Sequence, residues 1–251
     1  MGKGSKQNLQ SVFSKVPLSG RGSEGRAGVR INEQGGFSIM KTRIRKIGTV
    51  GTTAQMRVIP GHFATNHAHI NYYLDLTMLK SRTSEAKAIA KVMAGLYLFD
   101  TVVDTIVCME GMEVIGAFLS DELAKGGFMS MNRHKSIYVV RPEFNNNSQI
   151  IFRDNLVHMI EDKHVLVLVS SATTGLTVNK VIESILYYNG IMTGVSAIFG
   201  AVDEVDGVPI KAVFGKKDLP DYESYDYRDC PLCRQKQKLD ALVNAFGYSA
   251  L

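Results

Sequence analysis

An uninterrupted apolar run at residues 165–169 is the clearest element in the pattern of hydrophobic and polar positions. Each of its residues is Val or Leu without polar alternation, which is typical of a parallel strand covered on both faces. Small hydroxylated residues and one glycine follow, and residues 178–189 then place apolar side chains at helical spacing. The pattern predicts a central strand at 164–169, a tight turn and a helix.

Two similar strand-plus-helix units precede this one. They pair residues 105–108 with 114–124 and residues 136–140 with 155–160. A further helix is expected at 84–98, where apolar residues form one stripe. Alternation of this kind predicts the α/β class, with a mostly parallel central sheet flanked by helices on both faces.

Smaller features are predicted on either side of this core. Residues 193–202 and 208–214 flank Asp206-Gly207, which has the composition of a hairpin turn, so we expect the sheet to end in an antiparallel edge. Residues 47–57 and 67–75 indicate extended or irregular segments.

Basic residues are concentrated at the N-terminus. The chain carries a net charge of +5, but residues 1–39 hold six basic and two acidic residues, which leaves the other 212 residues at +1. This Gly- and Ser-rich segment shows no periodicity, so we predict a disordered basic extension at 1–39 and one domain at 40–251. The nearly neutral domain argues against nucleic-acid binding. No apolar run reaches the length of a membrane span, which makes a cytoplasmic protein the expectation.

The turn after the central strand has the composition of a phosphate-binding loop. Backbone N–H groups at a tight turn and at a helix N-terminus carry partial positive charge, so they can hold a phosphate without a basic side chain. An ordinary strand-to-helix connection capped by a threonine explains the pattern equally well. The candidate phosphate-binding residues are Ser170, Ser171, Thr173, Thr174, Gly175, Leu176 and Thr177.

This turn resembles the phosphate loop of type I phosphoribosyltransferases, and the wider pattern is most similar to the orotate branch of that family. In the family, an apolar strand leads to two acidic residues, two apolar residues and Thr-Thr-Gly-Gly-Thr; here the last five positions, 173–177, read Thr-Thr-Gly-Leu-Thr. The resemblance covers most of the chain after Met40. It implies the type I fold with a small hood, phosphoribosyl pyrophosphate or a nucleotide monophosphate as ligand, Mg²⁺ as cofactor, and a homodimer.

Three other segments fit this resemblance. Residues 105–116 correspond to a strand, a loop that contacts pyrophosphate and the start of a helix. Residues 137–141 correspond to the strand that the family follows with a basic, mobile loop. The Cys-Pro-Leu-Cys sequence at 230–233, in the C-terminal extension, is found in many orotate-type members. The implied pyrophosphate-loop residues are Glu110, Gly111, Met112 and Arg141.

Departures from the family pattern affect the chemistry. The two acidic positions, which hold the ribose hydroxyls in the family, are Val169 and Ser170 here. Leu176 replaces the second glycine of the loop, and the segment 142–149 lacks the family's lysine. Transfer of the phosphoribosyl group depends on neutralising the charge of the departing pyrophosphate, so these losses weaken that contribution.

Two hypotheses follow for the function. The first is a phosphoribosyltransferase that uses phosphoribosyl pyrophosphate and a nitrogenous base with altered site residues. The second is a catalytically inactive protein of the same fold that acts as a sensor or binds a partner. The intact Thr-Thr-Gly and Glu110-Gly111 loops favour the first, and the missing acidic pair and lysine favour the second. Whether the chain is an enzyme is therefore open at this stage.

Metal binding is a weaker candidate. Cys230 and Cys233 form a Cys-x-x-Cys pair, which suits half of a zinc site, a redox pair or a simple turn. Because Cys108 is the third and last cysteine, one chain cannot supply four thiolates. His67 and His69 would share one face of a strand and could ligate a metal, but no third ligand is evident nearby. The expectation is therefore no metal site, with Cys230 and Cys233 as weak candidates.

Overall fold

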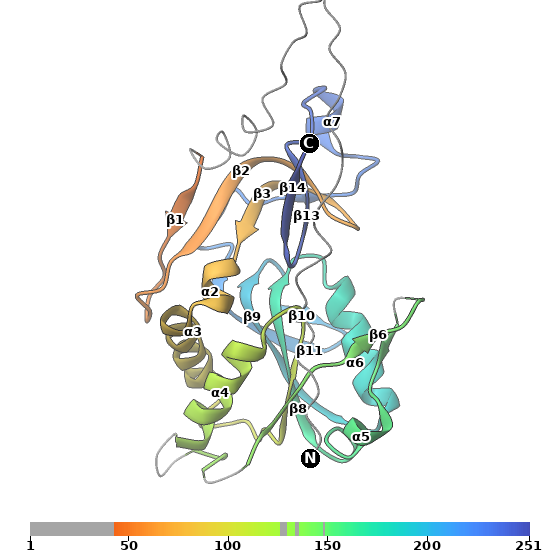
Figure 1. Ribbon diagram of the computed structural model, residues 1–251. Helices are drawn as coiled ribbons and strands as arrows, with labels where there is room; N and C mark the ends of the chain where they lie inside the picture. Colours follow the sequence, from red (N-terminus) through yellow and green to blue (C-terminus); the bar gives the residue numbers. More distant parts are fainter. Residues whose placement is uncertain (1–42, 126–129, 134–135, 148) are drawn as a thin grey trace, which may run out of the picture. The chain divides into compact units, whose positions relative to one another are not determined.

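The computed structural model describes residues 43–125, 130–133, 136–147 and 149–251, so the extension predicted at 1–39 lies outside the described residues. The described part contains a mostly parallel sheet flanked by helices and a second sheet, drawn above it in Figure 1. Among the described residues, no helix combines the length and the apolar character needed to span a membrane.

Six strands form the central sheet in the order β10-β11-β9-β8-β4-β5. All neighbouring pairs are parallel except β10 and β11, which are antiparallel at one edge. The predicted mostly parallel sheet with an antiparallel edge is therefore confirmed. The strands are β4 (Thr105–Cys108), β5 (Tyr138–Val140), β8 (His164–Ala172), β9 (Ile191–Gly200), β10 (Glu204–Val205) and β11 (Val208–Gly215).

Both faces of β8 are buried, as its unbroken apolar run predicts. Leu166 and Leu168 belong to the core shared with helices α3 (Thr83–Gly95) and α4 (Glu113–Lys125). Val167 and Val169 point to the opposite face and pack with helix α6 (Leu176–Tyr187). Successive side chains of a strand alternate between faces, so one apolar run supplies two separate cores.

Several predicted boundaries were wrong. Strand β8 continues three residues beyond 169, because Ser171 and Ala172 still pair with β9. The helix predicted at 155–160 is the single turn α5 (Asp154–Val157). The predicted Asp206-Gly207 turn exists, with φ of 51° and 75°, but it joins β11 to the short strand β10 and not to the strand predicted at 193–202. That segment is mostly β9, which pairs with β11 in parallel.

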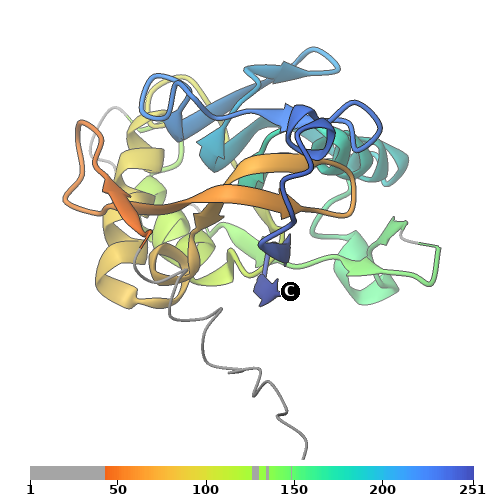
Figure 2. The same cartoon turned by 90° about the horizontal axis from the view of Figure 1, so that it is seen from above.

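The second sheet, here called the hood sheet, is larger than the small hood that the resemblance implies. It follows the order β12-β3-β2-β13-β14, with β1 also paired to β2. Strand β13, near the C-terminus, pairs in parallel with β2, and Figure 2 shows this dark blue segment beside the orange hood strands. Its strands are β1 (Arg45–Ile47), β2 (Met56–Ala64), β3 (His69–Asp75), β12 (Ser224–Tyr225), β13 (Ala241–Asn244) and β14 (Gly247–Ala250).

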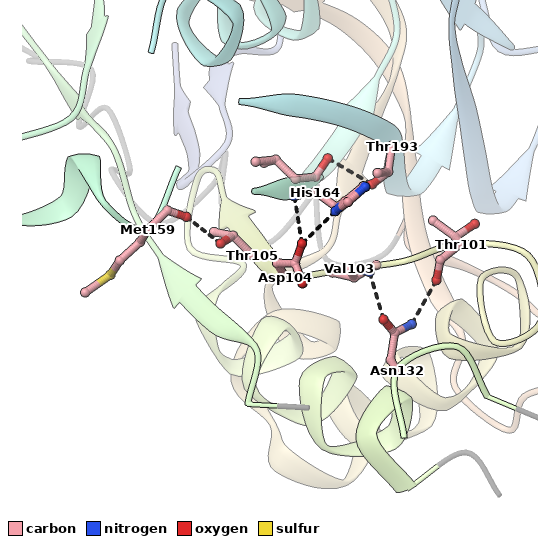
Figure 3. Close-up of polar contacts among 9 residues, drawn as sticks. Thr101, Val103, Asp104, Thr105, Asn132, Met159, His164 and Thr193 are labelled. Atoms are coloured by element: carbon pink, nitrogen blue, oxygen red, sulfur yellow. Dashed lines mark hydrogen bonds and ion pairs between the residues drawn. The ribbon is translucent and has the colours of Figure 1, made fainter. Parts of the chain in front are cut away.

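Polar side chains secure the amino ends of the central strands, as Figure 3 shows. The carboxylate of Asp104 accepts hydrogen bonds from the backbone N–H of His164 over 3.0 Å and from its Nδ1 over 2.7 Å, and so joins β4 to β8. The fully buried Asn132 side chain accepts from Val103 N–H and donates to the carbonyl of Thr101. These contacts lie at the end of the sheet opposite to the carboxyl ends of the strands.

Candidate functional site

The strand order of the central sheet reverses between β4 and β8. From β4 the chain continues to β5 on one side, and from β8 it continues to β9 on the other. In open α/β sheets, ligands bind in the crevice outside the carboxyl ends of the strands at such a reversal. The loops that leave these two strands carry the residues singled out from the sequence, at 110–112 and at 173–177.

The loop after β8 has the geometry expected of an anion-binding turn. Gly175 has φ of 76° and forms the N-cap of α6, whose first turn is not capped by a side chain. The first N–H groups of a helix have no intrahelical partner, so they are available to a ligand. Leu176, at the place of the family's second glycine, has a side chain that is 49% exposed.

A cleft with a volume of about 210 Å³ lies beside this loop. Four of the seven predicted phosphate-binding residues line it together with Glu110 from the loop after β4. The four are Ser171, Thr173, Thr174 and Thr177. The opposite wall comes from the hood sheet and its turns, and includes Asn66, His67, Tyr73 and Asn244. The structure therefore brings the two predicted loops together at one cleft.

Ser170 and Val169, which replace the family's acidic pair, are buried. Val169 is 1% exposed and packs in the α6 core, so this position does not face the cleft. Ser170 donates a hydrogen bond from Oγ to Glu110 Oε2 over 2.9 Å. The carboxylate of Glu110 therefore lies at the carboxyl end of β8, next to a position where the sequence has no acid.

Left-handed backbone shapes the loop that carries Glu110. Glu110 has φ of 53° and Gly111 has φ of 79°. The side chain of Met112 is fully buried and its N–H donates to the carbonyl of Met109, so this predicted residue offers no polar side-chain group. Arg141, at the end of β5, is exposed, and its Nη1 lies 3.4 Å from Glu113 Oε1. A neighbouring cavity of about 140 Å³ is lined by Arg141, Glu110 and other residues.

Lys80 also belongs to this region, although no motif or periodicity in the sequence singles it out. It lies in the last turn of helix α2 (Thr77–Ser81) and is buried, and its Nζ donates to the carbonyls of Glu110 over 3.1 Å and Ala245 over 2.6 Å. Burial lowers the pKa of Lys80, and the nearby carboxylates of Glu110 and Glu113 oppose that shift. Lys80 thus holds the Glu110 loop to the β13–β14 turn by a charged hydrogen-bond donor.

The cysteines of the C-terminal extension lie beside the antiparallel pair of β2 and β3, here called the hood hairpin. Cys230 and Cys233 come together with His62 of β2 and His69 of β3, and their four ligand atoms all lie within 4.8 Å of one another. The prediction of His69 as a candidate ligand fits this cluster, but His67 lines the cleft instead. His62 was not predicted; the sequence signal that could have found it is a further histidine seven positions before His69.

Comparisons with known proteins gave structural neighbours only. No family model and no curated protein matches the chain. It is similar to Mycobacterium tuberculosis H37Rv orotate phosphoribosyltransferase in complex with phosphoribosyl pyrophosphate, at 18% identity over 59% of this chain and 82% of that one, with a TM-score of 0.44. It is also similar to adenine phosphoribosyltransferase from Thermoanaerobacter pseudethanolicus, at 14% identity over 71% and 99%, with a TM-score of 0.44. Similarity at this level assigns no activity to the chain.

Proposed function

We propose that this chain is a phosphoribosyltransferase-like protein whose cleft binds phosphoribosyl pyrophosphate or a nucleotide monophosphate. The observation that carries the proposal is the meeting of two loops at the strand-order reversal, where Ser170 and Glu110 are joined by a hydrogen bond. A ligand with a phosphate and a sugar needs two such polar surfaces side by side. A homodimer and a cytoplasmic location, which the sequence led us to expect, stay predictions.

The phosphate of the ligand fits the loop after β8. Thr173, Thr174 and Thr177 line the cleft and supply hydroxyl donors, and the uncapped first turn of α6 supplies backbone N–H groups. Both kinds of donor stabilise a phosphate without a cationic side chain. This arrangement is consistent with the resemblance of Thr173-Thr174-Gly175 to the phosphate loop of type I phosphoribosyltransferases.

The sugar and the metal-bound pyrophosphate fit the loop after β4. Mg²⁺ is usually held by one or two carboxylates together with phosphate oxygens of the substrate, so Glu110 provides a sufficient protein ligand. A bound Mg²⁺ would neutralise part of the pyrophosphate charge. Arg141 lies near Glu110 and would add positive charge on the same side.

Beyond ligand binding, we propose that the chain transfers the phosphoribosyl group to a nitrogenous base. The bond between C1 of the ribose and the pyrophosphate oxygen would break, a bond from C1 to a ring nitrogen of the base would form, and the base would lose a proton. The family resemblance supports this reaction, but residues 142–149 contain no lysine to stabilise the departing pyrophosphate. Loss of one such stabiliser typically costs 10²–10³-fold in rate, roughly, so we expect slow turnover.

The second candidate function is a catalytically inactive sensor that binds the same ligand. The burial of Val169 favours it, because the acidic pair is replaced by a residue that belongs to the core and not to the cleft. Ligand binding is common to both candidates, and turnover distinguishes them. Release of pyrophosphate in the presence of a panel of purine and pyrimidine bases therefore separates an enzyme from a sensor.

Calorimetry with phosphoribosyl pyrophosphate, with and without Mg²⁺, tests the shared part of the proposal. We expect micromolar binding that Mg²⁺ strengthens and that Thr174→Ala weakens by about tenfold, the equivalent of one hydrogen bond to a charged group. Thr193→Ala is the matched control, because Thr193 lies near the amino end of β9 (Ile191–Gly200), away from the cleft, and donates to the carbonyl of Val165. Absence of binding, or equal loss in both variants, would contradict the proposed site.

A further inference from the structure

Four side chains from distant parts of the sequence form a compact nitrogen and sulfur cluster. The cluster consists of His62, His69, Cys230 and Cys233 and lies between the hood hairpin and the C-terminal extension. His62 and Cys230 are buried, with exposed fractions of 0% and 1%, whereas Cys233 is exposed. We propose that this cluster binds one Zn²⁺ ion as a structural site, which we call the Cys₂His₂ site.

Four of the six distances between ligand atoms in the cluster are close to the edges of a zinc tetrahedron. Zinc bonds of roughly 2.0–2.3 Å to nitrogen and sulfur place neighbouring ligand atoms about 3.3–3.8 Å apart. His62 Nε2 lies 3.1 Å from His69 Nδ1, 3.5 Å from Cys230 Sγ and 3.7 Å from Cys233 Sγ. Cys233 Sγ lies 3.3 Å from His69 Nδ1. All four ligand atoms lie within 4.8 Å of one another, so small movements of the side chains would bring them around one ion.

The tautomer of His62 is fixed by its surroundings. Its Nδ1 lies 2.8 Å from the carbonyl oxygen of Gln237, which can only accept a hydrogen bond. Nδ1 therefore carries the proton, and Nε2 points its lone pair at the other three side chains. A hydrogen bond of this kind, from the second ring nitrogen to a backbone carbonyl, is the usual support of a histidine that binds a metal.

A β-bulge turns His62 toward the cluster. The pairing of β2 with β3 shifts by one residue between Pro60 and Phe63. Bulges commonly re-aim a side chain, and this one places His62 on the same face as His69. Gly61 allows the close packing, because a Cβ at this position would lie 2.5 Å from Oδ2 of Asp240, which accepts the N–H of His62.

The ligand set determines which metal fits. Two thiolates and two imidazoles in a tetrahedron select Zn²⁺ over hard cations such as Mg²⁺, which prefer oxygen. Two thiolates balance the 2+ charge of the ion, so the buried side of the cluster need not hold a net charge. All four positions are filled by protein, which is typical of structural sites, whereas catalytic sites leave one position open.

Zinc at this site would cross-link the hood hairpin to the C-terminal extension. His62 and Cys230 are 168 positions apart in the sequence, so the metal closes a long loop. The turn between the two histidine ligands, including Thr65, Asn66 and His67, lines the cleft. The Cys₂His₂ site therefore positions one wall of that cleft and contributes to folding free energy.

Metal analysis of the full chain, purified under reducing conditions without a metal-affinity tag, tests the proposal. We expect one zinc per chain, and X-ray absorption spectroscopy should show zinc bonded to both sulfur and nitrogen. After replacement of zinc by Co²⁺, we expect the intense visible bands of tetrahedral thiolate coordination. This test needs neither a variant nor a ligand of the cleft. A weak octahedral spectrum, or a chain that binds no zinc after reconstitution, would overturn the site.

Variants then assign the ligands. Cys233→Ser, at an exposed position, is expected to lower zinc affinity at least about tenfold and to abolish the rise in Tm on adding zinc. His67→Ala is the matched control, because His67 lies between the two histidine ligands but outside the cluster, and it should retain one zinc. Cys108→Ala, which removes the third cysteine, should also retain it. Unchanged zinc affinity in Cys233→Ser, or an equal loss of affinity in His67→Ala, contradicts the assignment.

Discussion

The hydroxyl of Ser170 donates to the carboxylate of Glu110 over 2.9 Å and joins the ends of two strands that are neighbours in the sheet but 60 residues apart in the chain. This contact places a carboxylate beside the position where the family resemblance leads one to expect an acid at residue 170. The negative charge near the end of β8 thus comes from Glu110 in the loop after β4, and Ser170 of β8 holds it by a hydrogen bond.

Glu110→Gln separates the charge of Glu110 from its hydrogen bond. The amide oxygen of glutamine can still accept from Ser170, so we expect a change in unfolding free energy below about 1 kcal/mol. Binding of phosphoribosyl pyrophosphate should lose its dependence on Mg²⁺, because no carboxylate faces the metal. Calorimetry at several Mg²⁺ concentrations checks this. Ser170→Ala is the companion variant, because it removes the hydrogen bond and keeps the carboxylate. An unchanged Mg²⁺ dependence in Glu110→Gln would show that the carboxylate does not contact the metal.

Val169→Glu tests whether the acidic position of the family can be restored. Val169 is 1% exposed and packs in the α6 core, so a glutamate there would bury a charge without a partner. We expect a loss of unfolding free energy of roughly 3 kcal/mol or more, measured by denaturant titration. Val169→Ile, which stays apolar, should cost much less. A well-folded Val169→Glu with improved ligand binding would mean that this end of β8 faces the cleft.

Gly175→Ala should be more destabilising than Gly207→Ala. Both glycines have positive φ, at 76° and 75°, but a Cβ on Gly175 would lie 2.6 Å from Val205 Cγ2, whereas a Cβ on Gly207 would have no atom within 4 Å. Gly207→Ala therefore measures backbone strain alone, roughly 1 kcal/mol, and Gly175→Ala adds a steric clash. Thermal and denaturant unfolding of both variants provide the comparison. Equal losses would show that Val205 moves without cost.

Lys80 should make the protein's stability depend on alkaline pH. Because burial lowers the pKa of Lys80 in the folded state, the folded chain binds fewer protons than the unfolded chain between that lowered pKa and the ordinary value of about 10.4. Unfolding free energy should therefore rise with pH in that window for this residue. Lys80→Met removes this titrating group, so the unfolding free energy of the wild type minus that of the variant should increase with pH across that window. A difference that is independent of pH would contradict the lowered pKa.

Cys108 should be unreactive in the folded protein. It is buried in β4, and burial together with the nearby Glu113 raises the pKa of its thiol to about 12. The thiolate is the nucleophile, so at neutral pH almost none is present. Mass spectrometry after a brief exposure to iodoacetamide should find Cys233 modified in metal-free protein and Cys108 unmodified. In denaturant, all three cysteines should react, which controls for the reagent.

The sequence by itself determined the mostly parallel class of the central sheet and the strand, turn and helix around Thr173–Thr177. These features depend on local patterns: an apolar run has to be buried on both faces, and a Thr-Thr-Gly turn before a helical stripe presents backbone N–H groups. The edge turn at Asp206-Gly207 was also predicted, because only a residue pair tolerant of positive φ fits it.

Tertiary structure alone decided which distant groups meet. Three contacts join residues that are separated by 30 to 178 positions: Lys80 with two carbonyls, β13 with β2, and His62 with Cys230. The position of His62 also depends on the bulge in β2. No local periodicity records such contacts, since they depend on the register of strands and on the direction in which a bulge turns one side chain. His62 shows this most clearly, because no sequence pattern singles it out and only the folded hood places it beside His69, Cys230 and Cys233.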